Sequence, residues 1–220
     1  LPRIPKSKMP TARQEPTASV VNGKIYVIGG GESPSATNYN GAECYTTVEE
    51  YNPATDTWSD KSPMPTARWC HSASVVNDKI YIIGGAEADC YPFEIGCSIT
   101  SIEVYDPAKD TWTLVNGAIP RPMVNHSAAV LDGKIYIIGG ELTGYSLNVN
   151  VYDPHTNTWT QKKDMTAGKS DFGTVILNGK IITIGGDLGD VYTIVGDMQI
   201  YDPIYDTWTT TNTPLITPRV

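Results

Sequence analysis

The sequence has almost no phenylalanine, little histidine and no long apolar segment. Two Phe stand against thirteen Tyr, and only three His are present in 220 residues. No apolar run approaches the roughly 20 residues that a helix needs to cross a bilayer, so no such span is expected. Many Tyr with few Phe is typical of a β-rich protein whose aromatic rings lie partly in water.

Basic residues are also in the minority. Sixteen Lys and Arg stand against 24 Asp and Glu, which gives a formal net charge of −8. A chain with this charge argues against nucleic acid and anionic membranes as partners. The chain begins at Leu1 with neither an initiator Met nor a recognisable signal peptide, which indicates a processed chain or an excerpt of a longer one.

The usual arrangements of catalytic residues are missing as well. We find no Ser/His/Asp set, no carboxylate pair at a regular spacing and no phosphate-binding loop. The sequence therefore predicts no catalytic residues and no cofactor.

What the chain does contain is one stretch repeated four times. A turn-forming pair (Asn-Gly, Asp-Gly or Asn-Asp) is followed by Lys, four mostly apolar residues and two Gly. The copies are residues 22–30, 77–85, 132–140 and 178–186. The turn pair tolerates positive φ and predicts a β-hairpin, and the apolar run has the length of a buried strand. A run of small residues before each turn supplies the partner strand.

A second repeated motif follows each copy. Tyr, then Asn or Asp, then Pro precede a Trp that stands seven residues after the Tyr in every copy. The pairs are Tyr51 and Trp58, Tyr105 and Trp112, Tyr152 and Trp159, and Tyr201 and Trp208. Such constant spacing predicts a tight turn between two further strands. Each repeat is thus expected to form four strands, over about 17–58, 72–112, 127–159 and 173–208.

The Gly pair, the Tyr-Asp-Pro segment and the spaced Trp resemble kelch repeats, which form the blades of β-propellers. The resemblance extends from about Met9 to Arg219. It implies an all-β, kelch-type propeller over residues 1–220, with four four-stranded blades. Kelch propellers usually have five to seven blades. We therefore expect these four to be part of a larger or oligomeric ring.

The loops that join the second and third strands differ in length. From the second Gly to the Tyr there are 21 and 20 residues in the first two blades, against 12 and 15 in the others. Long loops on a rigid scaffold often bind partners, although ordinary variation in loop length is the alternative.

Basic residues recur sixteen positions before the Gly pair. They are Arg13, Arg68 and Lys169, with Met123 in the third copy and Arg219 in phase at the end. The resemblance places this position at the mouth of the central channel, where Arg in some kelch adaptors binds acidic peptides. The alternative is that each Arg holds backbone carbonyls of the following blade. Trp69, beside Arg68, is a candidate aromatic anchor for a partner.

His71 and His126 each stand three residues after that position in their repeats. Two His can ligate a metal, but no carboxylate or Cys recurs at a matching phase, so no metal is expected. The predicted partner-binding residues on this rim are Arg13, Arg68, Trp69, His71, His126, Lys169 and Arg219.

Four cysteines fall in or beside the longest loops: Cys44, Cys70, Cys90 and Cys97. In kelch-like propellers these segments share one rim, so the resemblance brings all four together. An even number in this arrangement predicts two disulfides, and we favour Cys90–Cys97 and Cys44–Cys70. That pairing would indicate an extracellular or secretory protein. Four thiols in a cytoplasmic protein are the alternative.

Taken together, these features predict a non-catalytic binding module that presents its loop rim to a protein segment, acidic or not, or to a glycan. One alternative is a kelch-type sugar-converting enzyme, similar to mutarotases or oxidases. Another is a structural subunit of an extracellular assembly. Self-association or further blades would complete the ring.

Overall fold

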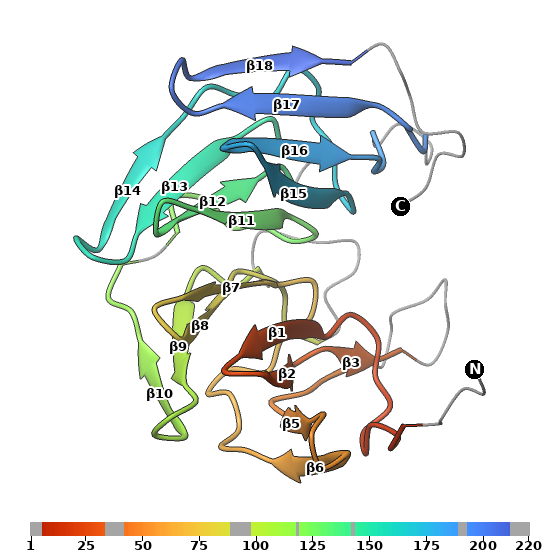
Figure 1. The fold of residues 1–220 in the computed structure, drawn as a ribbon. Coiled ribbons are helices and arrows are strands. Elements are labelled where there is room, and N and C mark those ends of the chain that lie inside the picture. The colour runs from red at the N-terminus through yellow and green to blue at the C-terminus, as the bar shows by residue number, and fades with distance from the viewer. Residues whose placement is uncertain are drawn as a thin grey trace, which may run out of the picture.

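The computed structural model describes residues 6–33, 42–88, 98–117, 119–141, 144–188 and 193–211, and all regular structure in them is β-strand. None of these residues belongs to a helix that could cross a membrane. The strands form four antiparallel four-stranded sheets, the blades, which follow one another around an arc (Figure 1). The prediction of an all-β fold with four-stranded blades is confirmed.

Within each blade the strands follow chain order from the inner to the outer edge. Blade 1 contains β1 (Thr17–Val21), β2 (Lys24–Ile28), β5 (Val48–Asn52) and β6 (Thr57–Asp60). Blade 2 contains β7 (Ser72–Val76), β8 (Lys79–Ile83), β9 (Ile102–Asp106) and β10 (Thr111–Leu114). Blade 3 contains β11 (Ser127–Leu131), β12 (Lys134–Ile138), β13 (Val149–Asp153) and β14 (Thr158–Gln161). Blade 4 contains β15 (Gly173–Leu177), β16 (Lys180–Ile184), β17 (Met198–Asp202) and β18 (Thr207–Thr210). A short ribbon, β3 (Gly31–Glu32) with β4 (Glu43–Cys44), extends from blade 1.

The inner hairpins form because their turn residues adopt left-handed backbone. In blade 1, Val21 pairs with Lys24 across Asn22 and Gly23, whose φ values are 49° and 76°. In blade 2 the same turn is made by Asn77 and Asp78, at 51° and 59°. Asn and Asp tolerate this region better than other non-glycine residues, which explains why the second copy needs no Gly.

The outer hairpins explain the constant Tyr–Trp spacing. Tyr105 and Trp112 are cross-strand partners, with ring centroids 5.0 Å apart. The Tyr105 hydroxyl donates to Asp110 Oδ1 over 2.6 Å, and Trp112 Nε1 donates to the carbonyl of Ser62 over 2.8 Å. The Trp is thus half-buried and fixes the chain that leaves the preceding blade. Any change in the spacing would break this pairing.

The first Gly of the pair permits the next blade to approach closely, and the second permits the entry loop of its own blade to do so. At Gly84 (φ 65°), a Cβ atom would lie 2.8 Å from the carbonyl oxygen of Met123 and 2.9 Å from the His126 ring. At Gly85 (φ 90°), a Cβ would lie 2.5 Å from the carbonyl oxygen of Trp69. Only Gly fits both the conformation and the space.

The core lies between blades rather than within them. We call the face of a blade that packs on the next blade in the chain its trailing face, and the opposite face its leading face. Tyr26 on the trailing face of blade 1 meets Tyr105 on the leading face of blade 2, with centroids 5.9 Å apart. Equivalent ring pairs join blades 2 and 3 and blades 3 and 4. The three interfaces are therefore repeats of one another.

The arc does not close on itself. Inner strands contact one another in the order β1, β7, β11 and β15, and no comparable pairing joins β15 to β1 in the described part of the chain. Leu177 on β15 is 57% exposed and Val20 on β1 is 63% exposed. Blades 1 and 4 are the two ends of the arc in Figure 1.

Candidate functional site

The basic residues predicted for the rim are buried ion-pair partners of the blades that they lead into. Arg13 Nη2 lies 2.7 Å from Glu49 Oε2, and Arg68 Nη2 lies 2.7 Å from Glu103 Oε1, with all four side chains at most 1% exposed. Lys169, also buried, is 3.1 Å from Asp197. Burial lowers the pKa of Arg68, and the Glu103 carboxylate opposes that shift.

Arg68 also holds the backbone of the blade that follows it. Its Nη1 donates to the carbonyl of Gly84 over 3.0 Å, and its Nη2 donates to Ser101 Oγ over 2.9 Å. Arg13 donates likewise to the Val27 carbonyl. The alternative role considered for these residues, support of the next blade, therefore describes their contacts. Partner binding by these cations stays a prediction, and their burial gives it no support; Arg219 lies outside the described residues.

Trp69 is fully buried rather than displayed on the rim. Its backbone pairs with Ala86, and its side chain packs in a small apolar cluster with Val124 and Cys70. The residue therefore fixes the loop that leads into β7. The prediction of an exposed aromatic anchor requires correction, because the ring has no surface to offer a partner.

The predicted disulfide between Cys44 and Cys70 is absent. Both residues are thiols: Cys70 Sγ donates to Glu15 Oε2 over 2.7 Å, and Cys44 Sγ lies 3.7 Å from the Ala86 carbonyl oxygen. Cys90 and Cys97 lie outside the described residues. The argument for an extracellular location rested on these bridges and loses this support.

His71 and His126 join the inner strands of adjacent blades. His71 Nε2 lies 3.0 Å from Thr17 Oγ1, and His126 Nε2 lies 2.8 Å from Ser72 Oγ. Burial lowers the pKa of His71 to about 3 and that of His126 to about 4, so both rings are neutral at pH 7. In the part of the chain that the structure describes, no three His, Cys, Asp or Glu are placed to hold a metal ion.

The mouth of the central channel is formed by the residues that stand one position before Pro16, His71, His126 and Phe172. Glu15, Cys70, Asn125 and Asp171 all have φ between 51° and 54°, which turns the chain from each loop into its inner strand. Asn125 donates its backbone N–H to Cys70, and Asp171 donates to Asn125, so the loops form a linked rim. Together with Pro16, His71, His126 and Phe172 they line a pocket of about 220 Å³.

This mouth is acidic, not basic. No ion pair among the described residues includes Glu15, Asp171 or Glu141. Burial raises the pKa of Asp171, and the Glu15 carboxylate raises it further. Burial likewise raises the pKa of Glu141, with a further contribution from Asp171. The carboxylates thus repel one another in a partly desolvated site.

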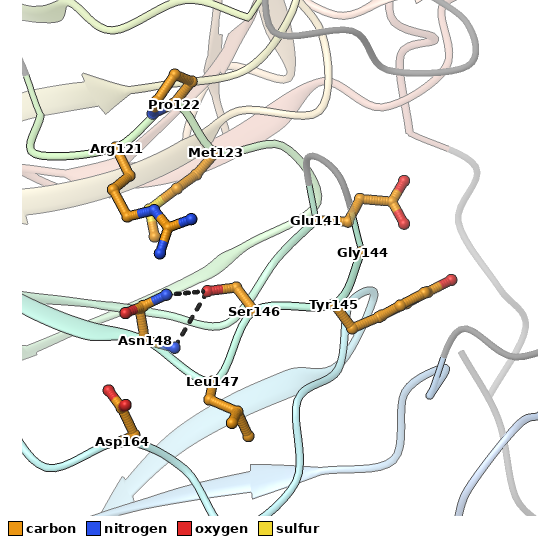
Figure 2. A pocket seen from close by; sticks show the side chains of 10 residues that line it. All are labelled: Arg121, Pro122, Met123, Glu141, Gly144, Tyr145, Ser146, Leu147, Asn148 and Asp164. Atoms are coloured by element: carbon orange, nitrogen blue, oxygen red, sulfur yellow. Dashed lines mark hydrogen bonds between the residues drawn. The ribbon is translucent and has the colours of Figure 1, made fainter.

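A second, larger pocket of about 390 Å³ lies over blade 3. Glu141 and Tyr145 are at one end of it, and Arg121, Asn148 and Asp164 are at the other (Figure 2). Its lining residues are Arg121, Pro122, Met123, Glu141, Gly144, Tyr145, Ser146, Leu147, Asn148 and Asp164.

Hydrogen bonds fix this pocket and connect it to the mouth. Ser146 Oγ accepts from the backbone and side-chain nitrogens of Asn148 over 3.1 and 2.8 Å, which fixes the loop (Figure 2). Asn125 Nδ2 donates to Glu141 Oε1 over 3.4 Å, so the larger pocket adjoins the channel mouth. The two pockets are therefore neighbours on the rim.

The sequence analysis did not identify Glu15, Asn125 and Asp171 as site residues, although each stands at the same position in its repeat. The mouth residues stand one position before Pro16, His71, His126 and Phe172 in every repeat. Polar residues of mixed type at that position do not form a visible motif. The long loops of blades 1 and 2, which were predicted to carry binding, contain residues 34–41 and 89–97, which the structure does not describe.

The geometry defines a class of protein: an arc of propeller blades with two neighbouring pockets, at the channel mouth and over blade 3, on the rim where the loops enter the inner strands. The comparisons identify the family. Residues 61–219 match the family described as the KLHDC2/KLHL20/DRC7 Kelch-repeats domain, and residues 12–65 match the Kelch motif. The chain belongs to the kelch-repeat family, whose domains are commonly protein-binding modules.

Curated relatives are longer than this chain. It is 34% identical over 200 residues to Kelch-like protein terF of Aspergillus terreus, covering 84% of this chain and 41% of that protein. It is 27% identical over 254 residues to Kelch-like protein 25 of Rattus norvegicus, covering 93% of this chain and 42% of that protein. Among solved structures, that of YjhT matches with a TM-score of 0.66 at 15% identity, covering 94% of this chain and 86% of that one. This last likeness concerns the fold alone.

Proposed function

We propose that this chain is a non-catalytic module that binds a protein segment across the channel mouth and the adjoining pocket of blade 3. One observation carries the proposal: two neighbouring pockets, of about 220 and 390 Å³, are lined by Asn125 and by Glu141, and these two side chains are hydrogen-bonded to each other. Two adjacent pockets suit an extended segment that spans both better than a compact solute that fills one. The kelch-repeat family supports a protein as the partner.

The charge of the surface favours a segment that carries Lys or Arg. Asp171 is exposed and Glu141 is partly buried, and neither has a cationic partner in an ion pair among the described residues. A cation placed between them would relieve their repulsion and form charge-assisted hydrogen bonds. An acidic segment, which the sequence had suggested, would meet like charge here. Pairing with buried Arg13 or Arg68 would require breaking their present ion pairs.

The test is a binding titration with two synthetic peptides of equal length, one rich in Arg and one rich in Glu. We expect saturable binding of the Arg peptide and at least about tenfold weaker binding of the Glu peptide. Asp171→Asn and Glu141→Gln keep the shape and remove one charge each. Each should weaken the Arg peptide by about three- to tenfold.

Asp60→Asn is the matched control, since Asp60 is exposed on outer strand β6 of blade 1. It removes the same net charge and should leave the affinity unchanged. If all three variants weakened binding equally, attraction by net charge alone would explain the result. Preference for the Glu peptide would reject the assigned surface.

A further inference from the structure

A pocket of about 350 Å³ lies between blades 2 and 3, at the rim opposite the channel mouth. Lys79 and Lys109, which line it, lie at the turns that join β7 to β8 and β9 to β10. These turns are at the far ends of the strands from the loops that form the mouth. The pocket shares no described lining residue with the mouth or with the pocket over blade 3, so it is a separate site.

The corresponding place in blade 1 holds a carboxylate of the chain itself. Glu50 Oε1 accepts from Lys24 Nζ over 2.7 Å, and Glu50 Oε2 accepts from the Tyr26 hydroxyl over 2.8 Å. Burial acts to raise the pKa of Glu50, but the hydrogen bonds from Lys24 and Tyr26 and the charge of Lys61 together hold it below its ordinary value. A Lys and a Tyr at these two positions therefore bind a carboxylate.

Blade 2 keeps the Tyr but not the carboxylate. Tyr81 pairs with Val104 across β8 and β9, as Tyr26 pairs with Glu50 across β2 and β5. Tyr81 is only 9% exposed, and its hydroxyl has no hydrogen-bond partner among the described residues. Burial raises the pKa of this hydroxyl, so it stays a donor at pH 7. A buried phenol that lines a pocket without an acceptor is placed to donate to a ligand.

Blade 2 also keeps the Lys. Lys79 is the first residue of β8, as Lys24 is of β2. It lies 4.0 Å from Asp106, and Lys109 lies 3.6 Å from the same carboxylate. The described lining thus has two cations against one anion, and this surplus of positive charge favours an anionic ligand.

The segment that leaves blade 2 differs from its counterparts beside this pocket. In blades 1 and 3, six positions separate the outer-strand Trp from the Met that follows the blade, but seven separate Trp112 from Ile119. The Trp of the following blade normally donates to this segment, as Trp208 Nε1 does over 2.8 Å. After blade 2, the carbonyl of Asn116 instead accepts from Asn157 Nδ2 over 3.1 Å. Asn116 and Asn157 both line the pocket, so the extra residue changes its border.

We propose that this pocket binds the carboxylate of a small organic acid. The carboxylate accepts from Lys79 and Tyr81 as Glu50 accepts from Lys24 and Tyr26, and these hydrogen bonds are charge-assisted. Val104 and the Tyr152 ring offer apolar surface to the rest of the molecule. The volume is at the lower end of the range for ligand pockets, which suits a small solute.

The test is an NMR titration of the chain with acetate, butyrate and phenylacetate at constant ionic strength. Each acid is compared with its amide, which has nearly the same shape and no charge. We expect saturable binding of phenylacetate, with its amide at least about tenfold weaker. Carboxylate-independent binding, or no binding of any of the three acids, would overturn the proposal.

Two conservative variants locate the site. Tyr81→Phe removes one hydroxyl and should weaken phenylacetate about tenfold, and Lys79→Met should weaken it about three- to tenfold. Lys180→Met is the matched control, since Lys180 begins β16 of blade 4 and its side chain is 48% exposed, against 47% for Lys79. It should leave the affinity unchanged. Equal effects of Tyr81→Phe and Lys180→Met would show that the acid binds elsewhere.

A third variant copies blade 1 into blade 2. Val104→Glu supplies a carboxylate from the chain itself, at the position that Glu50 has in blade 1. It should abolish binding of phenylacetate while circular dichroism shows an intact fold. A folded Val104→Glu chain that still bound phenylacetate with wild-type affinity would overturn the proposal. If this variant does not fold, Tyr81→Phe and Lys79→Met decide the question.

Discussion

At the scale of single residues, the inner loops carry two sets of polar groups with opposite roles. One set is buried and paired: Arg68 with Glu103 holds a blade together, and His126 with Ser72 joins a blade to its neighbour. The other set, Asp171 at the mouth and Glu141 in the neighbouring pocket, has raised pKa values and no cationic partner in an ion pair among the described residues. The first set supports the fold and the second is placed to bind.

The buried His residues should make the protein sensitive to acid. The pKa of His126 is about 4 in the folded chain and near its ordinary value of 6.5 when unfolded. Between these values the unfolded chain binds more protons, so the free energy of unfolding falls as pH drops from about 6.5 to 4. His126→Phe copies Phe172, which lies over Gly139 as His126 lies over Gly84. It should flatten that slope in urea denaturation measured at several pH values. An unchanged slope would contradict the assignment of a neutral buried ring.

The buried ion pair of blade 2 can be replaced only as a pair. Arg68→Met alone leaves Glu103 buried and uncompensated, and should reduce the free energy of unfolding by about 3–5 kcal/mol. Blade 3 carries Met123 and Asn150 at the equivalent positions. The double variant Arg68→Met/Glu103→Asn should therefore recover most of the loss.

Lys79→Met is the matched control for this experiment. Lys79 lies 4.0 Å from Asp106 with its side chain 47% exposed, so its removal should cost less than about 1 kcal/mol. Equal losses for Arg68→Met and Lys79→Met in denaturant unfolding would show that burial of Arg68 does not matter.

At the scale of elements, the decisive feature is how closely each hairpin approaches the next blade. In blades 1 to 3 the first Gly after the second strand leaves space for the backbone and the His or Phe ring of the following blade, and the second Gly leaves space for the entry loop of its own blade. Close contact between blades replaces a core within each blade. Stability should therefore depend strongly on the Gly pair and much less on Gly residues in the exposed turns.

Two Gly→Ala substitutions distinguish the cost of a left-handed backbone from the cost of a steric clash. Gly84 and Gly133 have similar φ values, 65° and 71°, but nothing lies within 4 Å of a Cβ at Gly133. Gly133→Ala should cost about 1–2 kcal/mol for the left-handed conformation. Gly84→Ala should cost a further ~1–3 kcal/mol because it would clash with the Met123 carbonyl. Thermal and denaturant unfolding measure both, and equal costs would reject close blade packing.

Local features of the fold could be read from the sequence, and long-range ones could not. The turn at Asn22-Gly23 and the Tyr105–Trp112 pair involve neighbours in the chain, so their residues signal them directly. Arg68 stands in the loop before β7, and its partner Glu103 stands in β9. The two residues are far apart in the chain, so their pairing cannot be read from the local sequence. The sequence analysis therefore placed Arg68 on the rim, whereas its ion pair with Glu103 holds the side chain inside the blade. The same limit hid the Asn125–Glu141 contact that connects the two pockets.

At the scale of the whole molecule, four blades form an open arc with two kinds of surface. The loop rim carries the two neighbouring pockets, and the two end faces carry apolar residues. The rim and the end faces therefore differ in chemistry and in position.

The measurement that tests the central claim most directly is hydrogen–deuterium exchange of the chain with and without the Arg-rich peptide. We predict slower exchange over the mouth and pocket segments, 122–125, 144–148 and 169–171. The turns between third and fourth strands, such as 53–56 and 107–110, should be unchanged. Slower exchange confined to those turns, with the mouth and pocket segments unaffected, would contradict the account.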